Sequence, residues 1–212
     1  PTADLTELLL LDSVNIFLSK QRKSRRGKRG FQTGPKPIYL QKHVMETVDR
    51  FVTIGFNKPF LINGEISLTF VPVGHLLGAA AAVLTIHENG ESKKIAFSGD
   101  LGRKNYPVLN DPEPLPQVDY LVCESTYGGR WHKATQSVDE MLVETVNEAC
   151  VKSPGRLIIP AFSVGRTQAL VYSLNRIFSK GLLPRVKVFV DSPMATYATE
   201  IFRKHHPILN KE

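Results

Sequence analysis

The stretch from Ile66 to His75, with the sequence ISLTFVPVGH, decides the fold of the first half of the chain. Apolar and small polar residues alternate from Ile66 to Phe70, which is typical of a β-strand with one face toward a core. We therefore predict a strand within residues 60–73, followed directly by a glycine and a histidine.

The flanking sequence extends this pattern. Residues 79–86 and 94–97 predict two further strands, and Asn89-Gly90 between them indicates a hairpin turn. Upstream, leucines recur at helical spacing after Thr2, which can cap a helix that ends near Lys20, and residues 43–51 form a second plausible helix. The first part of the chain is expected to be a β-rich layer with accompanying helices.

The pattern changes after residue 117. We predict a buried strand at residues 118–123, strands at 156–159 and 186–190, and helices at 136–151, at 164–178 and from residue 194. Strands that alternate with helices favour an α/β unit with a largely parallel sheet. The boundary between the two parts is expected near residues 125–130.

The bulk composition is that of an ordinary globular protein. Of the 212 residues, 42% are hydrophobic and 22% charged, and no apolar run reaches the roughly 18 residues that a membrane helix needs. The two cysteines allow at most one disulfide, and we do not expect a secreted protein, because the first residues show no basic-then-apolar leader pattern. We expect a cytoplasmic protein, or a nuclear one in a eukaryote, that does not bind membranes.

The net charge of +7 favours a polyanionic partner. Much of the charge lies between Lys20 and Gly30, which we predict to be a flexible basic loop. A solvated loop without a partner and an RNA contact are equal alternatives for this segment. The residues that would make the RNA contact are Arg22, Lys23, Arg25 and Arg26.

Three predicted strands end in residues that can carry chemistry. His75 follows the first strand between two glycines, Asp100 follows the strand at 94–97, and Glu124 follows the strand at 118–123. Each has an ordinary interpretation, a structural histidine or a turn-capping carboxylate. Because strand ends of one sheet can converge on one edge, together they predict a shared site for a metal ion or for acid–base catalysis.

A second feature lies where a predicted strand leads into a helix at Ser163-Val164-Gly165-Arg166. Helix N-terminal amides can bind a phosphate, with Ser163 or Arg166 assisting, and a plain helix cap at Ser163 is an equal alternative. Ser192-Pro193 forms a similar turn, which is fully explained by a helix cap followed by proline at the first helical position.

Several separated motifs resemble, in order, those of the metallo-β-lactamase-fold RNA nucleases that contain a β-CASP domain. This family includes cleavage and polyadenylation endonucleases and bacterial RNA-processing enzymes, and the resemblance covers nearly the whole chain. The motifs are Gly74-His75-Leu76-Leu77-Gly78-Ala79, Ser98-Gly99-Asp100, Glu124-Ser125-Thr126-Tyr127-Gly128, residues 159–169 and residues 190–195.

The resemblance implies roles for individual residues. His75 would bind one zinc ion, Asp100 would bridge two, and Glu124 would orient a histidine that protonates the leaving group. His132 resembles a histidine that often follows the Glu-Ser-Thr-Tyr-Gly motif, and we expect a structural or substrate-side role for it. The zinc ions would supply the nucleophilic water and stabilise the phosphate.

The sequence also departs from the family pattern. The His-x-His-x-Asp-His motif, which supplies most zinc ligands in the family, is absent, as are the last histidine motifs. We therefore expect a partial sequence that alone cannot hold two zinc ions and is inactive.

The resemblance implies an α/β fold with a partial metallo-β-lactamase αββα core at residues 1–127 and part of a β-CASP domain at residues 128–212. The implied function is zinc-dependent hydrolysis of single-stranded RNA, internally or from an end, with a second copy or other nuclease-complex subunits as possible partners. The alternatives are a non-catalytic subunit that binds RNA or a nuclease, and a small-molecule metallohydrolase.

Overall fold

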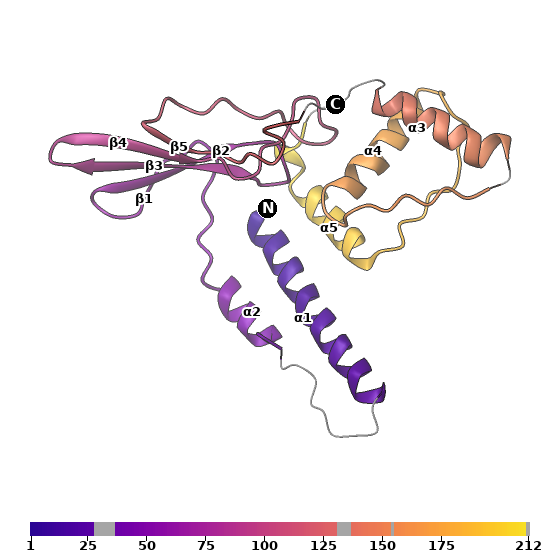
Figure 1. The fold of residues 1–212 in the computed structure, drawn as a ribbon, viewed down its shortest axis with the longest axis horizontal. Helices are drawn as coiled ribbons and strands as arrows, with labels where there is room; N and C mark the ends of the chain where they lie inside the picture. Colours follow the sequence, from indigo (N-terminus) through magenta and orange to yellow (C-terminus); the bar gives the residue numbers. More distant parts are fainter. Residues whose placement is uncertain (28–36, 131–136, 154, 211–212) are drawn as a thin grey trace.

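A computed structural model describes the backbone of residues 1–27, 37–130, 137–153 and 155–210, and the side chains of these residues except 22–27. Figure 1 shows a five-stranded sheet on one side of the molecule, the helices α3, α4 and α5 on the other, and α1 with α2 below them.

The sheet has the strand order β1-β2-β3-β4-β5. The first three neighbouring pairs are antiparallel, and β5 pairs with β4 in parallel. The strands are β1 (Phe60–Leu61), β2 (Ile66–Pro72), β3 (Ala80–Glu88), β4 (Glu91–Phe97) and β5 (Tyr120–Val122). The predicted strands of the first half are confirmed, and Asn89 and Gly90 at φ 50° and 84° form the predicted turn between β3 and β4.

The inward face of the sheet carries a small apolar core. Val71, Val83 and Ala96 are buried together, and Val83 lies opposite Ala96 in the β3–β4 register. Val71 is 5% exposed and lies on the same face of β2 as Thr69, which is paired with Val83. The apolar residues of the predicted alternation, such as Ile66 and Leu68, lie on the opposite face and are half-buried. This core holds the ends of β2 and β4 at one edge of the sheet.

The helix α1 (Thr2–Gly27) is longer than the sequence predicts, and α2 (Gln41–Val48) packs beside it. The predicted flexible basic loop is wrong for residues 20–27, which continue α1. Lysine, arginine and glutamine form helices nearly as well as alanine, and cations near a helix C-terminus are favoured by the helix dipole. Thr2 also does not cap the helix, because it lies in the first turn and its hydroxyl donates to the Gly78 carbonyl at 3.1 Å.

The second half folds into helices around their own core. Here α3 (Val138–Val146) leads into a π-helical turn (Asn147–Lys152), followed by α4 (Arg166–Ser179), α5 (Pro193–Lys204) and a 3-10 turn (His206–Ile208). Ser137 and Glu140 form a capping box at the start of α3. Arg176 of α4 binds both carboxylate oxygens of Asp139 at 2.8 and 2.7 Å. The buried side chains of this core are Leu142, Val146, Leu174, Ile177 and Leu183.

The predicted parallel sheet of the second half is not found in the part of the chain that the structure describes. Residues 156–159 and 186–190 are not paired as strands, and Ile158 and Phe189 are 85% and 83% exposed. The tendency of a residue to lie in a strand reflects packing against neighbouring strands. An apolar segment that has no strand to pair with therefore does not form a strand itself. The only parallel pair among the described strands is β4 with β5.

The expectation of a buried strand at residues 118–123 needs correction. β5 is an edge strand whose three residues are exposed. An edge strand covered on neither face cannot bury its side chains, which explains the difference. Cys123 is exposed and Cys150 is half-buried, and both are free thiols. None of the described helices is long and apolar enough to cross a membrane.

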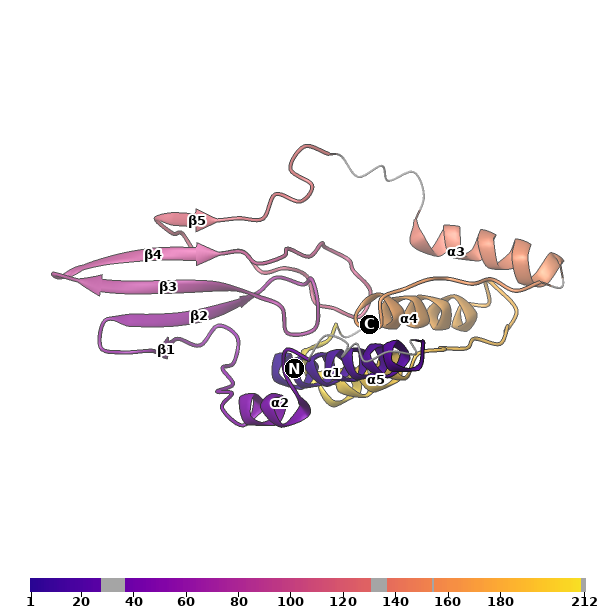
Figure 2. The ribbon, with the colours of Figure 1, turned by 60° about the horizontal axis from the view of Figure 1, so that its bottom comes forward.

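The two halves meet at an apolar seam. Leu5 of α1, Leu77, Leu109 and Phe202 of α5 form a buried cluster. Figure 2 shows α1 and α5 lying side by side, and Asp4 binds both Lys204 and His205 across this contact. Leu77 belongs to the loop after β2, so the seam fixes that loop against the helices.

Candidate functional site

The three predicted strand-end residues lie at the same edge of the sheet. β2 and β4 are each antiparallel to β3, and β5 is parallel to β4, so β2, β4 and β5 all end at one edge. His75, Asp100 and Glu124 follow these three strands. The prediction that the three strand ends meet at one edge of the sheet is therefore confirmed.

His75 and Asp100 face each other across this edge. The Nε2 atom of His75 lies 3.8 Å from Oδ2 of Asp100, and their side chains are 40% and 75% exposed. Both groups are accessible to a ligand from solvent. An imidazole nitrogen and a carboxylate oxygen at this distance can contact one ion or one substrate atom together.

Gly102 allows the two loops to approach this closely. Its N–H donates to the Val73 carbonyl at 2.8 Å. A β-carbon on Gly102 would lie 2.1 Å from the carbonyl carbon and oxygen of Gly74 and 2.6 Å from the backbone nitrogen of His75. Any side chain at this position would push the His75 loop away from the Asp100 loop.

Glu124 braces the Asp100 loop from the neighbouring strand. Its Oε1 accepts the Leu101 N–H at 2.6 Å, and its own N–H donates to the Ser98 hydroxyl at 3.0 Å. Hydrogen bonds from the Thr126 hydroxyl and from the Leu101 backbone lower the pKa of Glu124 below its ordinary value. Glu124 is consequently a carboxylate, and an acceptor, at neutral pH.

The donor types at this edge suit zinc in part. Zinc binds imidazole nitrogen and carboxylate oxygen at roughly 2.0–2.2 Å, so two donors of one ion lie at most about 4 Å apart. His75 and Asp100 satisfy that limit. The described residues contain no group of three or more His, Cys, Asp or Glu side chains that could hold a metal, so they provide two donors at this edge and not a full set.

The Ser163–Arg166 turn lies next to the His75 loop. Gly165, at φ +84°, precedes α4, and a β-carbon there would lie 2.6 Å from Cδ2 of Leu76. The Arg166 guanidinium lies 5.8 Å from the centre of the Phe162 ring and is exposed. The structure thus brings the predicted phosphate-binding turn beside the loop that carries His75.

Ser163 itself does not cap α4. Its hydroxyl lies 3.2 Å from the hydroxyl of Ser192, which caps α5 as predicted by accepting the Ala195 N–H. The start of α4 is instead held by Gln168, whose Oε1 accepts the Gly165 N–H at 2.7 Å. Gln168 is buried and also donates to the Ser163 carbonyl and to the Thr199 hydroxyl. It fixes the two helix starts relative to each other.

Five predicted site residues have side chains outside the described part of the chain. His132 lies outside the described residues altogether. The side chains of Arg22, Lys23, Arg25 and Arg26 are likewise outside the description, although their backbone belongs to α1.

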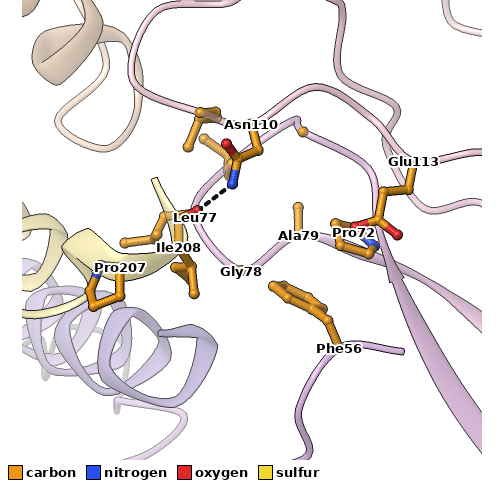
Figure 3. A pocket seen from close by; sticks show the side chains of 12 residues that line it. Phe56, Pro72, Leu77, Gly78, Ala79, Asn110, Glu113, Pro207 and Ile208 are labelled. Carbon is orange, nitrogen blue, oxygen red and sulfur yellow. Dashed lines mark hydrogen bonds between the residues drawn. The ribbon is translucent and has the colours of Figure 1, made fainter. Parts of the chain in front are cut away.

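A pocket lies behind the His75 loop (Figure 3). Its volume is about 220 Å³, and it is bounded by Gly74 and the loop residues 76–79, by Phe56 and by Pro207 and Ile208. The side chain of Asn110 closes one end by donating to the Ile208 carbonyl at 3.0 Å. The residues that line the pocket are mainly apolar, and Leu77 and Leu109 also belong to the buried seam.

Two residues that shape the site escape prediction from the sequence. Ser98 and Gly102 touch the backbone of the loops and carry no distinctive spacing of their own. In the sequence, Ser98 belongs to the Ser98-Gly99-Asp100 motif and Gly102 follows it within a glycine-rich run, but neither residue receives a role of its own there. Such a run indicates close backbone approach without saying what approaches.

Comparison with known proteins finds one matching family model and several relatives. The family model described as the Beta-Casp domain matches residues 167–212. A ribonuclease of Thermus thermophilus is 37% identical over 161 residues, which are 76% of this chain and 35% of that protein.

Two other relatives span more of the chain. Transcription termination factor FttA of Methanothermobacter thermautotrophicus is 30% identical over 90% of this chain and 28% of its own length. Endoribonuclease YSH1 of Kluyveromyces lactis is 27% identical over the whole chain and 27% of its own length. The chain therefore spans about a third or less of the length of these relatives. With the ordered motifs, the domain match and these relatives, the chain belongs to the β-CASP family of metallo-β-lactamase-fold proteins.

Proposed function

We propose that the full-length protein hydrolyses phosphodiester bonds of single-stranded RNA with the help of zinc. The observation that carries the proposal is the placement of His75 and Asp100, 3.8 Å apart and exposed, at the edge where Glu124 also lies. Relatives named as a ribonuclease and an endoribonuclease support RNA as the substrate.

Each residue at the sheet edge has a distinct part in the proposal. His75 and Asp100 would donate to zinc, and further ligands would come from outside the described residues. Zinc bound there would supply a water nucleophile that ionises near neutral pH and would stabilise negative charge on the phosphate. Glu124, ionised at neutral pH, would hold a proton donor by accepting its hydrogen bond, and would not itself supply the proton.

The substrate side of the proposal uses the second half of the chain. The exposed Arg166 and the N-terminus of α4 would hold an RNA phosphate, with the Ser163 hydroxyl as an additional partner. The closeness of Gly165 to Leu76 supports this arrangement, because Leu76 directly follows His75 in the chain. RNA would then lie between a metallo-β-lactamase portion, residues 1–127, and a β-CASP portion, residues 128–212.

The experiment that tests this function uses the full-length protein, zinc-loaded, with single-stranded RNA labelled at one end. Cleavage that requires both zinc and Asp100 is the expected result, and the product ladder separates internal cutting from cutting at an end. A folded protein that binds zinc and leaves RNA intact would contradict the proposed substrate.

A second candidate is a non-catalytic subunit that binds RNA or a nuclease. The same assay distinguishes the two, because a binding subunit would retain RNA without zinc and without cleavage.

A further inference from the structure

Ser98 is the most deeply buried polar residue at the site. It follows β4, is 2% exposed, and lies two residues before Asp100. Its N–H donates to the Val122 carbonyl at 2.9 Å, which continues the β4–β5 pairing. Its hydroxyl donates to the Gly99 carbonyl at 2.7 Å and accepts the Glu124 N–H at 3.0 Å. Both hydrogen-bonding functions of the hydroxyl are therefore used inside the protein.

The Glu124 side chain also binds the loop that contains Ser98. The Ser98 hydroxyl holds the backbone of Glu124, and the Glu124 carboxylate holds the Leu101 N–H at 2.6 Å. The two interactions enclose Gly99 and Asp100, which are the only residues between Ser98 and Leu101. The turn that carries Asp100 is thus fixed at both ends by one neighbouring residue.

The enclosed turn contains a glycine and an exposed side chain. Gly99 adopts a positive φ of 58°, and Asp100 projects outward with its side chain 75% exposed. An exposed carboxylate on a glycine-containing turn keeps its direction only if the backbone on each side is held. The Ser98 hydroxyl supplies the buried half of that restraint.

We propose that Ser98 is a positioning residue for the metal donor Asp100 and for Glu124. Its hydroxyl sets the distance between the ends of β4 and β5, so that the Asp100 carboxylate faces His75 while the Glu124 carboxylate remains on Leu101. Ser98 touches neither metal nor substrate. The proposal rests on the proposed function in so far as Asp100 binds zinc.

The test compares Ser98→Ala with Ser98→Thr, which keeps the hydroxyl oxygen, and with Ser173→Ala. Ser173 is a matched control because it is 1% exposed and lies in α4, outside the site. In the full-length protein, Ser98→Ala is expected to weaken zinc binding by roughly tenfold to a hundredfold, the usual effect of removing a hydrogen-bond partner behind a metal ligand. Ser98→Thr is expected to restore zinc affinity, and Ser173→Ala to leave it unchanged.

A second measurement does not depend on zinc. Hydrogen exchange at the Leu101 amide of the metal-free protein should become several-fold faster in Ser98→Ala, although Ser98 does not itself bind that amide. The role of Ser98 would be overturned if folded Ser98→Ala kept the zinc affinity of wild type or the Leu101 exchange rate of wild type. It would also be overturned if Ser98→Thr melted at the wild-type temperature but did not regain zinc affinity. If wild type binds no zinc while Leu101 exchange responds to Ser98→Ala, the proposed metal function fails and the positioning of Glu124 by Ser98 stands.

Discussion

Asp4 in the first turn of α1 binds His205 at the end of α5, 201 positions away in the sequence. Lys204 donates to the other carboxylate oxygen of Asp4 at 3.0 Å. The hydrogen bond to His205, followed by that to Lys204, lowers the pKa of Asp4 from its ordinary value of 3.8. This polar contact lies beside the apolar seam and joins the same two helices.

The lowered pKa gives a pH-dependent prediction. Ionised Asp4 stabilises the fold above about pH 4, and this stabilisation is lost as the pH falls through the lower pKa of the folded state. Asp4→Asn should lower the free energy of unfolding by about 1 kcal/mol at pH 7, as for a favourable partly exposed ion pair. The difference from wild type should shrink as the pH falls below 4. Urea denaturation at several pH values measures it, with Glu200→Gln, which removes only an exposed pair with Arg203, as control.

Gly102→Ala tests the close approach of the two loops. The new β-carbon would overlap the backbone of Gly74 and His75, so the loops must separate. We expect a decrease of about 1–3 kcal/mol in stability, the usual effect of overpacking, together with weaker zinc binding. Gly64→Ala is the control, because a β-carbon on Gly64 has no atom within 4 Å. If Gly102→Ala had the zinc affinity and stability of wild type, the two loops could move apart without affecting either property.

Asp100→Asn should separate metal binding from RNA binding. Because the Asp100 side chain is 75% exposed, its replacement should change stability by no more than about 0.5 kcal/mol. The rate of RNA cleavage should fall more than about a hundredfold, because removing a metal ligand itself costs more than removing a residue that only supports one. RNA affinity measured without zinc should stay close to wild type. Asp49→Asn, at the exposed end of α2, serves as control; activity within a few-fold of wild type in Asp100→Asn would remove Asp100 from the metal site.

Neutralising the basic end of α1 should weaken RNA binding and flatten its dependence on salt. For single-stranded RNA, each phosphate neutralised by a cation adds about 0.7 to the steepness with which the logarithm of the binding constant falls with the logarithm of the salt concentration. Losing four such contacts should therefore reduce this steepness by up to roughly 3. The residues to be replaced by glutamine are Arg22, Lys23, Arg25 and Arg26.

The matched control replaces four exposed cations elsewhere. These are Lys42, Lys93, Lys180 and Arg185. The two sets are compared by titration with single-stranded RNA at salt concentrations between about 50 and 200 mM. Over this interval the RNA affinity is expected to change by about tenfold or more. An equal slope for both would leave the end of α1 as ordinary solvated surface.

The parts of the fold that sequence predicted well are those with strong local patterns. Alternation around Ile66 gave β2, Asn89-Gly90 gave the hairpin, and Ser192-Pro193 gave the start of α5. The convergence of His75, Asp100 and Glu124 followed from strand direction alone. These features depend on a few adjacent residues or on simple sheet geometry.

The failures share a different cause. Residues 156–159 and 186–190 have the composition of strands, but pairing requires a neighbour, which no local pattern specifies. The extension of α1 was missed because charge suggested a solvated loop, whereas the same lysines and arginines favour a helix. Ser98 was missed because its importance lies in its hydrogen bond with Glu124, 26 positions away.

The rigidity of α1 has a consequence for the length of RNA that the protein would bind. Thr2 touches Gly78 in the loop that carries His75, and Figure 1 shows α1 running away from the sheet. Arg22 lies 20 residues further along, or about 30 Å at 1.5 Å per residue. A strand that keeps the spacing of a duplex strand, about 3.4 Å per nucleotide, needs roughly nine nucleotides to cover that distance, and a more extended single strand needs fewer. The helix would thus act as a ruler, so that only an RNA extending about that far from the cleaved bond reaches the basic residues at its end.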